Sequence, residues 1–276
     1  MLALCDPPTG GSGIATPAGW SKVGQVHDRR LLEISGAAGS AASPDILWVH
    51  NDSGDSARVF ALTHLGDVVA EIELAGVATI DAEDIAVGPG PRSAGNAAWL
   101  YLADIGDNAL ERSSIQLHRL PEPTLRDARV AAERIDLQYP DGRARNAETL
   151  LVDPVRGDVV IVTKTDGVAE VFTATRDALE SGSTTLVAAG TLDIGPLATG
   201  GAVSADGLRV SVRTKREVLL WDRVKGESLV EALARAPRLR MAAPKAESVA
   251  FRSDGRGLYA IPEGSQPPVM AFDLPD

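Results

Sequence analysis

The chain has 276 residues, enough for one large domain or two small ones. Apolar residues make up 44% and charged residues 24%, so the chain can bury a full core and is neither disordered nor fibrous. Its 27 basic and 38 acidic side chains give a formal charge of −11. This charge argues against nucleic acid and anionic membranes as main partners, because phosphate groups are bound by clustered Lys and Arg.

Residues 1–18 are expected to lie outside the fold, as a flexible tail or tether. Cys5 is the single cysteine, which excludes an intrachain disulfide and a multi-cysteine metal site. The small residues before it and the Gly/Ser/Pro-rich stretch 7–13 resemble the end of a bacterial lipoprotein signal peptide. The basic segment and long apolar stretch of a full signal are not in the sequence. Two readings stay open: a lipid anchor at Cys5 on a secreted or envelope-attached protein, or a disordered tail on a cytoplasmic one. The sequence contains no run of 18 apolar residues, so it predicts no transmembrane helix.

Short apolar or alternating runs, bounded by Gly, Pro, Asn and Asp, recur along the rest of the chain and predict β-strands. The clearest strand of each repeat covers 46–49, 99–102, 159–162, 208–212 and 257–261. A shorter apolar segment precedes each of these strands, and an alternating run follows it. A fourth strand is expected in four of the repeats, at 68–74, 132–137, 185–192 and 229–236, although the last stretch could also be a helical turn.

Four-stranded units that recur about every 40–50 residues are typical of a β-propeller. The sequence therefore predicts an all-β, five-bladed propeller over 19–276, a single domain that we expect to be a monomer. The fifth unit ends after three strands, and residues 19–27 are expected to supply its outer strand and close the ring. Six blades is the alternative, if the region 103–145 forms a further sheet.

Aligning the first strands of the units places one residue of each in a common column: Ser35, Glu83, Glu148, Gly201 and Glu247. First strands surround the axis of a propeller, so the three glutamates are expected to converge near the channel mouth. Carboxylates that meet repel one another unless a cation, a proton or a basic side chain lies between them. They are candidates for a metal site, a cationic-ligand site or an acid–base pair. The alternative is that they accept hydrogen bonds that join the blades.

An Asp-x-Gly-Asp motif follows the second strand of the first two units. Its aspartates can cap a tight turn or bind a hard cation through oxygen, and calcium is the expected ion. The predicted metal ligands are Asp52, Asp55, Glu83, Asp104 and Asp107. Later units carry Lys164 and Arg213 at equivalent positions, where a basic side chain could hold a phosphate or carboxylate beside the metal.

Three stretches of the sequence together resemble uncharacterised secreted propellers of actinobacteria: residues 47–55, 82–86 and 102–108. These are similar in turn to the family described as "esterase-like activity of phytase", whose recurrent motif is Asp-x-Glu-Gly-Ile/Leu-Ala. Residues 81–86 match that motif except that Asp84 replaces the glycine. The resemblance covers roughly residues 30–265, and it implies an extracytoplasmic propeller and phosphoester hydrolysis.

The sequence thus predicts a propeller that binds a metal ion, a small ligand or a protein partner at an acidic channel mouth. The first alternative is a calcium-assisted phosphoesterase, in which Lys164 and Arg213 steady the phosphoryl group. The second is a glycosidase, in which two of Glu83, Glu148 and Glu247 act as acid and base. Motifs for nucleophilic catalysis and for phosphate loops are absent from the sequence.

Overall fold

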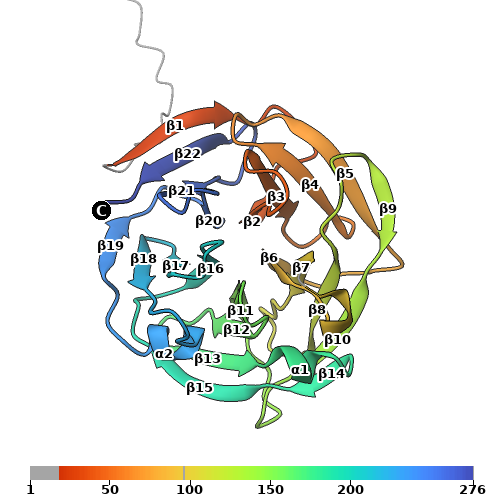
Figure 1. Ribbon diagram of the computed structural model, residues 1–276, viewed down its shortest axis with the longest axis vertical. Helices are drawn as coiled ribbons and strands as arrows, with labels where there is room; N and C mark the ends of the chain where they lie inside the picture. The colour runs from red at the N-terminus through yellow and green to blue at the C-terminus, as the bar shows by residue number, and fades with distance from the viewer. Residues whose placement is uncertain (1–18, 96, 276) are drawn as a thin grey trace, which may run out of the picture.

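Five sheets, antiparallel except for one parallel outer strand in each of two sheets, surround a common axis in the computed structural model, which describes residues 19–95 and 97–275 (Figure 1). The inner strands β2, β6, β11, β16 and β20 lie nearest the axis. This arrangement confirms the predicted five-bladed propeller. The six-bladed alternative is wrong, because the region 103–145 supplies outer strands of the first two blades and no further sheet.

In hydrogen-bonding order from the axis outward, the first blade contains β2 (Ile34–Gly39), β3 (Ile46–Asn51), β4 (Arg58–Thr63), β5 (Val68–Ala75) and β9 (Ala128–Ala131). The second blade contains β6 (Ala82–Pro89), β7 (Ala98–Asp104), β8 (Ile115–Pro121), β10 (Glu133–Gln138) and β14 (Ser183–Thr185). The short 3-10 helix η1 (Arg92–Ala94) lies between β6 and β7.

The third blade contains β11 (Ala147–Val152), β12 (Val159–Thr163), β13 (Ala169–Ala174) and β15 (Val187–Leu192). The helix α1 (Arg176–Leu179) connects β13 to β14. The fourth blade contains β16 (Ala198–Val203), β17 (Arg209–Thr214), β18 (Glu217–Asp222) and β19 (Leu239–Ala242). The fifth contains β20 (Ala250–Phe251), β21 (Gly257–Ala260), β22 (Pro268–Asp273) and, from the other end of the chain, β1 (Trp20–Gln25).

The fourth strand expected at 229–236 is wrong, and the alternative of a helical turn in this stretch is confirmed. This stretch begins with the helix α2 (Leu229–Leu233), and the outer strand of the blade is β19. The helix starts at a capping box, in which the Ser228 hydroxyl accepts from the Glu231 backbone N–H and the Glu231 carboxylate accepts from the Ser228 N–H. Such reciprocal capping satisfies backbone donors that a helix start leaves free.

The N-terminal strand closes the ring as predicted. β1 pairs antiparallel with β22, so the two ends of the chain share one blade. Trp20 packs against Phe272 with their ring centroids 5.3 Å apart, and its indole N–H donates to the carbonyl of Ala242 on the fourth blade at 2.9 Å. Two other outer strands also link blades: β9 pairs parallel with β5, and β14 pairs parallel with β10.

The hydrophobic core lies between neighbouring blades. Along β3, Ile46 and Trp48 pack into a cluster shared with the second blade, whereas Leu47 and Val49 pack into a cluster shared with the fifth. Each of the five clusters found among the described residues joins two adjacent blades in this way. Strands buried on both faces are apolar throughout, which is why the second strands stand out so clearly in the sequence.

An extra residue interrupts the pairing between the inner and second strands of four blades. These bulged residues are Ser35, Glu83, Glu148 and Thr199. A bulge turns one side chain out of the regular alternation, and bulges often lie beside binding sites. In the fourth blade the bulge shows that Thr199 occupies the predicted column. The expected Gly201 is wrong, because two adjacent glycines gave no side-chain pattern with which to fix the register.

The predictions for residues 1–18, including lipidation of Cys5, lie outside the described residues. Among residues 19–95 and 97–275, no helix has the length and apolar character needed to cross a membrane.

Candidate functional site

Six carboxylates and one lysine gather at the end of the ring where the inner strands begin and the second strands end. We call this group the acidic mouth, and its members are Asp52, Asp81, Glu83, Glu148, Lys164, Glu247 and Glu263. They come from the first, second, third and fifth blades. The convergence of three glutamates predicted from the repeat therefore involves a larger group, with three further carboxylates around them.

Asp52 stands at the centre of the acidic mouth. One set of carboxylate oxygens, from Asp52, Asp81 and Glu83, lies within 4.8 Å of one another, and so does a second set from Asp52, Glu247 and Glu263. Two oxygens bound to the same Ca²⁺ at about 2.4 Å lie at most about 4.8 Å apart. Either set could therefore supply part of the coordination shell of one cation.

Glu83 carries the strongest electrostatic conflict of this site. Its side chain is buried, with 2% of the residue exposed. No hydrogen bond to its carboxylate is formed within the described part of the chain, and burial followed by the charges of Glu148, Asp52 and Asp81 raises its pKa strongly. A buried carboxylate that lacks a donor is unfavourable unless a proton or a cation neutralises it.

The negative charge of Glu148 is partly balanced by Lys164, whose ammonium group forms an ion pair with the Glu148 carboxylate. The other carboxylate oxygen of Glu148 is buried without a partner. Burial raises the pKa of Glu148, although the ion pair opposes that shift, and the lysine pKa is also raised, because its carboxylate neighbours outweigh its burial. Burial likewise raises the pKa values of Asp52, Asp81 and Glu263. One ammonium group thus faces six carboxylates, and the site holds an excess of negative charge.

Asp84 lies directly behind Glu83 and ties three blades together. Its carboxylate accepts backbone N–H groups from Ile85 at 2.9 Å, from Leu150 at 2.9 Å and from Gly201 at 3.2 Å. Full burial nevertheless raises its pKa well above the usual range. The residue that replaces the glycine of the resembled motif is therefore a structural bridge across the axis, and its oxygens already have donors.

The other predicted metal ligands hold turns. Asp104 accepts the backbone N–H groups of Ile80 and Asp81 and forms an ion pair of 2.8 Å with Arg112. Asp107 accepts the N–H groups of residues 111 and 112. These contacts match the turn-capping alternative of the sequence analysis.

Asp55 also has protein partners. Its carboxylate accepts from the Asn51 side chain at 2.7 Å and forms an ion pair of 2.9 Å with Arg58. Of the two Asp-x-Gly-Asp turns, the structure therefore brings only Asp52 together with Glu83.

Arg213 lies behind the acidic mouth and supports it indirectly. Its guanidinium is fully buried and donates to the carbonyl oxygens of Pro244 and Ala246, in the segment that leads into Glu247. Burial lowers its pKa to about 10, against the opposing effect of the Glu247 charge. Arg213 thus positions this segment, and its buried guanidinium is not available to hold a phosphoryl group in the solvent.

Asp81 and Glu263 complete the two sets of carboxylates but are missing from the predicted metal ligands. Asp81 lies two residues before the bulged Glu83, and Glu263 follows the second strand of the fifth blade, as Asp52 does in the first. The signal for Glu263 was therefore topological, because it lies in the loop equivalent to that of Asp52 and equivalent loops of neighbouring blades meet around one axis. The signal for Asp81 was its position two residues before Glu83 in the sequence.

The comparisons with known proteins bear on the fold alone. No family model and no curated protein matches the chain. Among solved structures, the gluconolactonase XC5397 from Xanthomonas campestris is 14% identical, covers 98% of this chain and 96% of its own, and has a TM-score of 0.51. Hydrazine synthase from Kuenenia stuttgartiensis is 12% identical over 88% of this chain and 84% of its own, with a TM-score of 0.46. U3-55K is 13% identical over 87% of this chain and 68% of its own, with a TM-score of 0.45. At these identities, the likeness to the gluconolactonase concerns the propeller architecture.

Proposed function

We propose that this propeller binds a divalent cation of the calcium class at the acidic mouth, with Asp52, Asp81 and Glu83 as its first ligands. The observation that carries the proposal is Glu83: a buried carboxylate without a hydrogen-bond donor, whose oxygen meets two further carboxylate oxygens at spacings that one cation can bridge. Calcium prefers such hard oxygen ligands and tolerates irregular geometry. The cation would neutralise the charge that the protein leaves uncompensated.

Cation binding of this kind suits a protein outside the cytoplasm. Extracellular calcium modules bind with dissociation constants of about 10⁻⁴ to 10⁻³ M, which is useful only where the ion is abundant. We therefore propose a secreted or envelope-attached location. Lipidation of Cys5 remains a prediction that mass spectrometry of the native protein can check.

Thermal unfolding with and without calcium tests the proposal. Calcium at 10 mM is about 10 to 100 times such a dissociation constant and would stabilise the native state by about 1.4–2.7 kcal/mol. For a domain of this size, that corresponds to a rise in Tm of roughly 3–10 °C. We expect such a rise with 10 mM CaCl₂ and its loss in Asp52→Asn and Glu83→Gln.

The matched control is Asp67→Asn, which removes an exposed acid from the β4–β5 turn. It should keep the full calcium response. An unchanged Tm of the unmodified protein in millimolar calcium, confirmed by the absence of heat in a calorimetric titration, would refute cation binding.

A metal-assisted phosphoesterase is the second candidate, and Lys164 is the observation that favours it. Its ammonium group lies among the same carboxylates, where it could balance the charge of an anion bound to the cation. Calcium-dependent hydrolysis of p-nitrophenyl phosphate that is lost in Lys164→Met, with calcium binding retained, would support this activity. Calcium binding without turnover would leave the protein as a binding module.

A further inference from the structure

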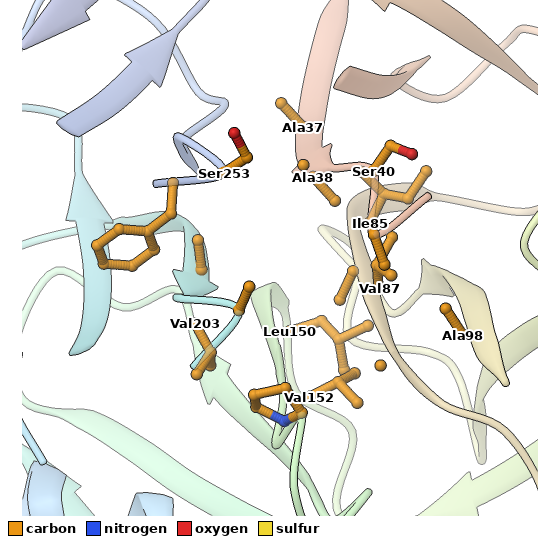
Figure 2. A pocket seen from close by; sticks show the side chains of 18 of the residues that line it. Ala37, Ala38, Ser40, Ile85, Val87, Ala98, Leu150, Val152, Val203 and Ser253 are labelled. Carbon is orange, nitrogen blue, oxygen red and sulfur yellow. The ribbon is translucent and has the colours of Figure 1, made fainter. Parts of the chain in front are cut away.

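A concave site lies at the end of the ring opposite the acidic mouth. The order of residues along β6 shows this: Glu83 belongs to the acidic mouth, Asp84 follows it, and Ile85 and Val87 line a cavity of about 410 Å³. We call it the apolar cavity (Figure 2). The inner strands of all five blades contribute to its wall, and the residues that define it are Ala37, Ala38, Ile85, Val87, Leu150, Val152, Ala202, Val203 and Phe251.

Two of the polar side chains that line the apolar cavity, Ser40 and Arg252, have protein partners, and the third, Ser253, carries an exposed and uncharged hydroxyl (Figure 2). Ser40 donates its hydroxyl to Glu122 at 2.6 Å. Arg252 forms ion pairs with Asp254 at 2.8 Å and with Asp273 at 2.5 Å. A charged ligand would therefore lose its hydration without gaining a free counter-ion among these groups, which is strongly unfavourable.

Asp84 separates the two sites. Its carboxylate holds the backbone N–H groups of Leu150 and Gly201, and both of these residues line the apolar cavity. Both oxygens of the Asp84 carboxylate already accept backbone hydrogen bonds. Asp84 therefore offers no free acceptor to a ligand in the apolar cavity. The two ends of the ring thus differ in chemistry: six carboxylates at one, aliphatic side chains at the other.

From this cavity we infer that the propeller binds an uncharged aliphatic small molecule at the end opposite its acidic mouth. The volume lies in the range of about 300–1,000 Å³ that is usual for small-molecule sites. The wall consists mainly of Ala, Val, Ile and Leu side chains, fixed on strands whose positions the inter-blade packing determines. Such a wall favours hydrocarbon by removing apolar surface from water, and it selects against charge.

Calorimetric titration with 1-octanol and with octanoate tests this inference, because the two probes share a chain length and differ in charge. We expect one saturable octanol site per chain, and octanoate binding weaker by about tenfold or more. Octanol binding should be the same with calcium and with a chelator, and it should persist in Asp52→Asn. This independence separates the inference from the proposed cation site.

Val203→Trp supplies the decisive variant, since it places an indole into the cavity from β16. It should weaken octanol binding by about tenfold or more. Val187→Trp is the control, because Val187 is 62% exposed on the outer strand β15. If Val203→Trp does not fold, Ala86→Leu fills the same cavity with a smaller change. The inference is overturned by the absence of saturable octanol binding, by equal affinity for octanoate, or by cavity-filling variants that bind octanol as the unmodified protein does.

Discussion

Glu83 places a carboxylate in a buried position without a donor, and this conflict has a measurable effect on stability. Its pKa is raised in the folded protein above the usual 4.5. A group with a raised folded pKa contributes stability that is fully present below the unfolded pKa and is lost as the pH rises through the folded value. In the absence of a cation, the folded protein therefore loses stability as the pH rises above about 4.5, because folding must either keep Glu83 protonated or bury its charge.

We accordingly expect Glu83→Gln to stabilise the cation-free protein at about pH 8 by on the order of 1–3 kcal/mol, because the amide resembles the protonated acid. The gain should shrink as the pH falls toward about 5, because the carboxyl of the unfolded chain then approaches its ordinary pKa and takes up a proton as well. Urea unfolding in the presence of a chelator at both pH values measures the difference. A variant that is less stable than the unmodified protein at pH 8 would contradict this account of Glu83.

Asp104 provides a test of whether the aspartates of the Asp-x-Gly-Asp turns are structural residues or metal ligands. It is 1% exposed and already binds Arg112 and two backbone N–H groups. Asp104→Asn should therefore lower the Tm, because removing one charge of a buried pair leaves the other without compensation. The calcium-induced rise in Tm should keep its full size. Loss of the calcium response with an unchanged Tm would instead return Asp104 to the metal site.

The sequence could indicate Glu83 and Glu148 because both recur at one position of a repeat. It could not separate Asp52 from Asp55 and Asp104, since all three lie in the same Asp-x-Gly-Asp motif. Their partners distinguish them. Asp55 forms an ion pair with Arg58 and Asp104 forms one with Arg112, whereas Asp52 faces acidic side chains of other blades. Such long-range contacts depend on how the blades are arranged around the axis, which a single motif does not encode.

At the scale of the elements, the six-residue strand β1 makes contacts with two blades. It supplies the outer edge of the fifth blade, and Trp20 reaches from it to a carbonyl of the fourth blade. The prediction of this strand rested on counting: a fifth repeat with three strands needs a fourth. β19 was missed because the helix α2 intervenes in the fourth blade, so that the outer strand begins later than in the other repeats.

We expect Trp20→Ala to destabilise the protein by about 3–5 kcal/mol, as for other large-to-small substitutions of a buried aromatic residue. The loss combines the packing against Phe272 with the hydrogen bond to Ala242. Trp20→Phe should recover most of the packing but not the hydrogen bond, and its free energy of unfolding should lie between those of Trp20→Ala and the native chain. Urea unfolding measures all three proteins, and a Trp20→Ala variant as stable as the native chain would show that β1 does not close the ring.

At the scale of the whole molecule, the hydrophobic packing that stabilises the fold lies between neighbouring blades. Each hydrophobic cluster spans two neighbouring sheets, so an unfolded blade would expose the cores on both of its sides. The sequence predicted the number of blades from the repeat period. It could not predict which faces pack together, because the strands are apolar on both faces and carry no inside-out alternation.

This packing predicts a single cooperative unfolding transition. The four tryptophans lie in four different blades, at Trp20, Trp48, Trp99 and Trp221. Their fluorescence and the far-UV circular dichroism should therefore change at the same urea concentration, because no blade can lose its core alone. Removing residues 19–26, which include β1, should separate the two curves, since the fifth blade then opens first while the blades farthest from the gap keep both neighbours. Separate transitions in the intact protein would mean that the blades unfold independently and that shared cores do not couple them.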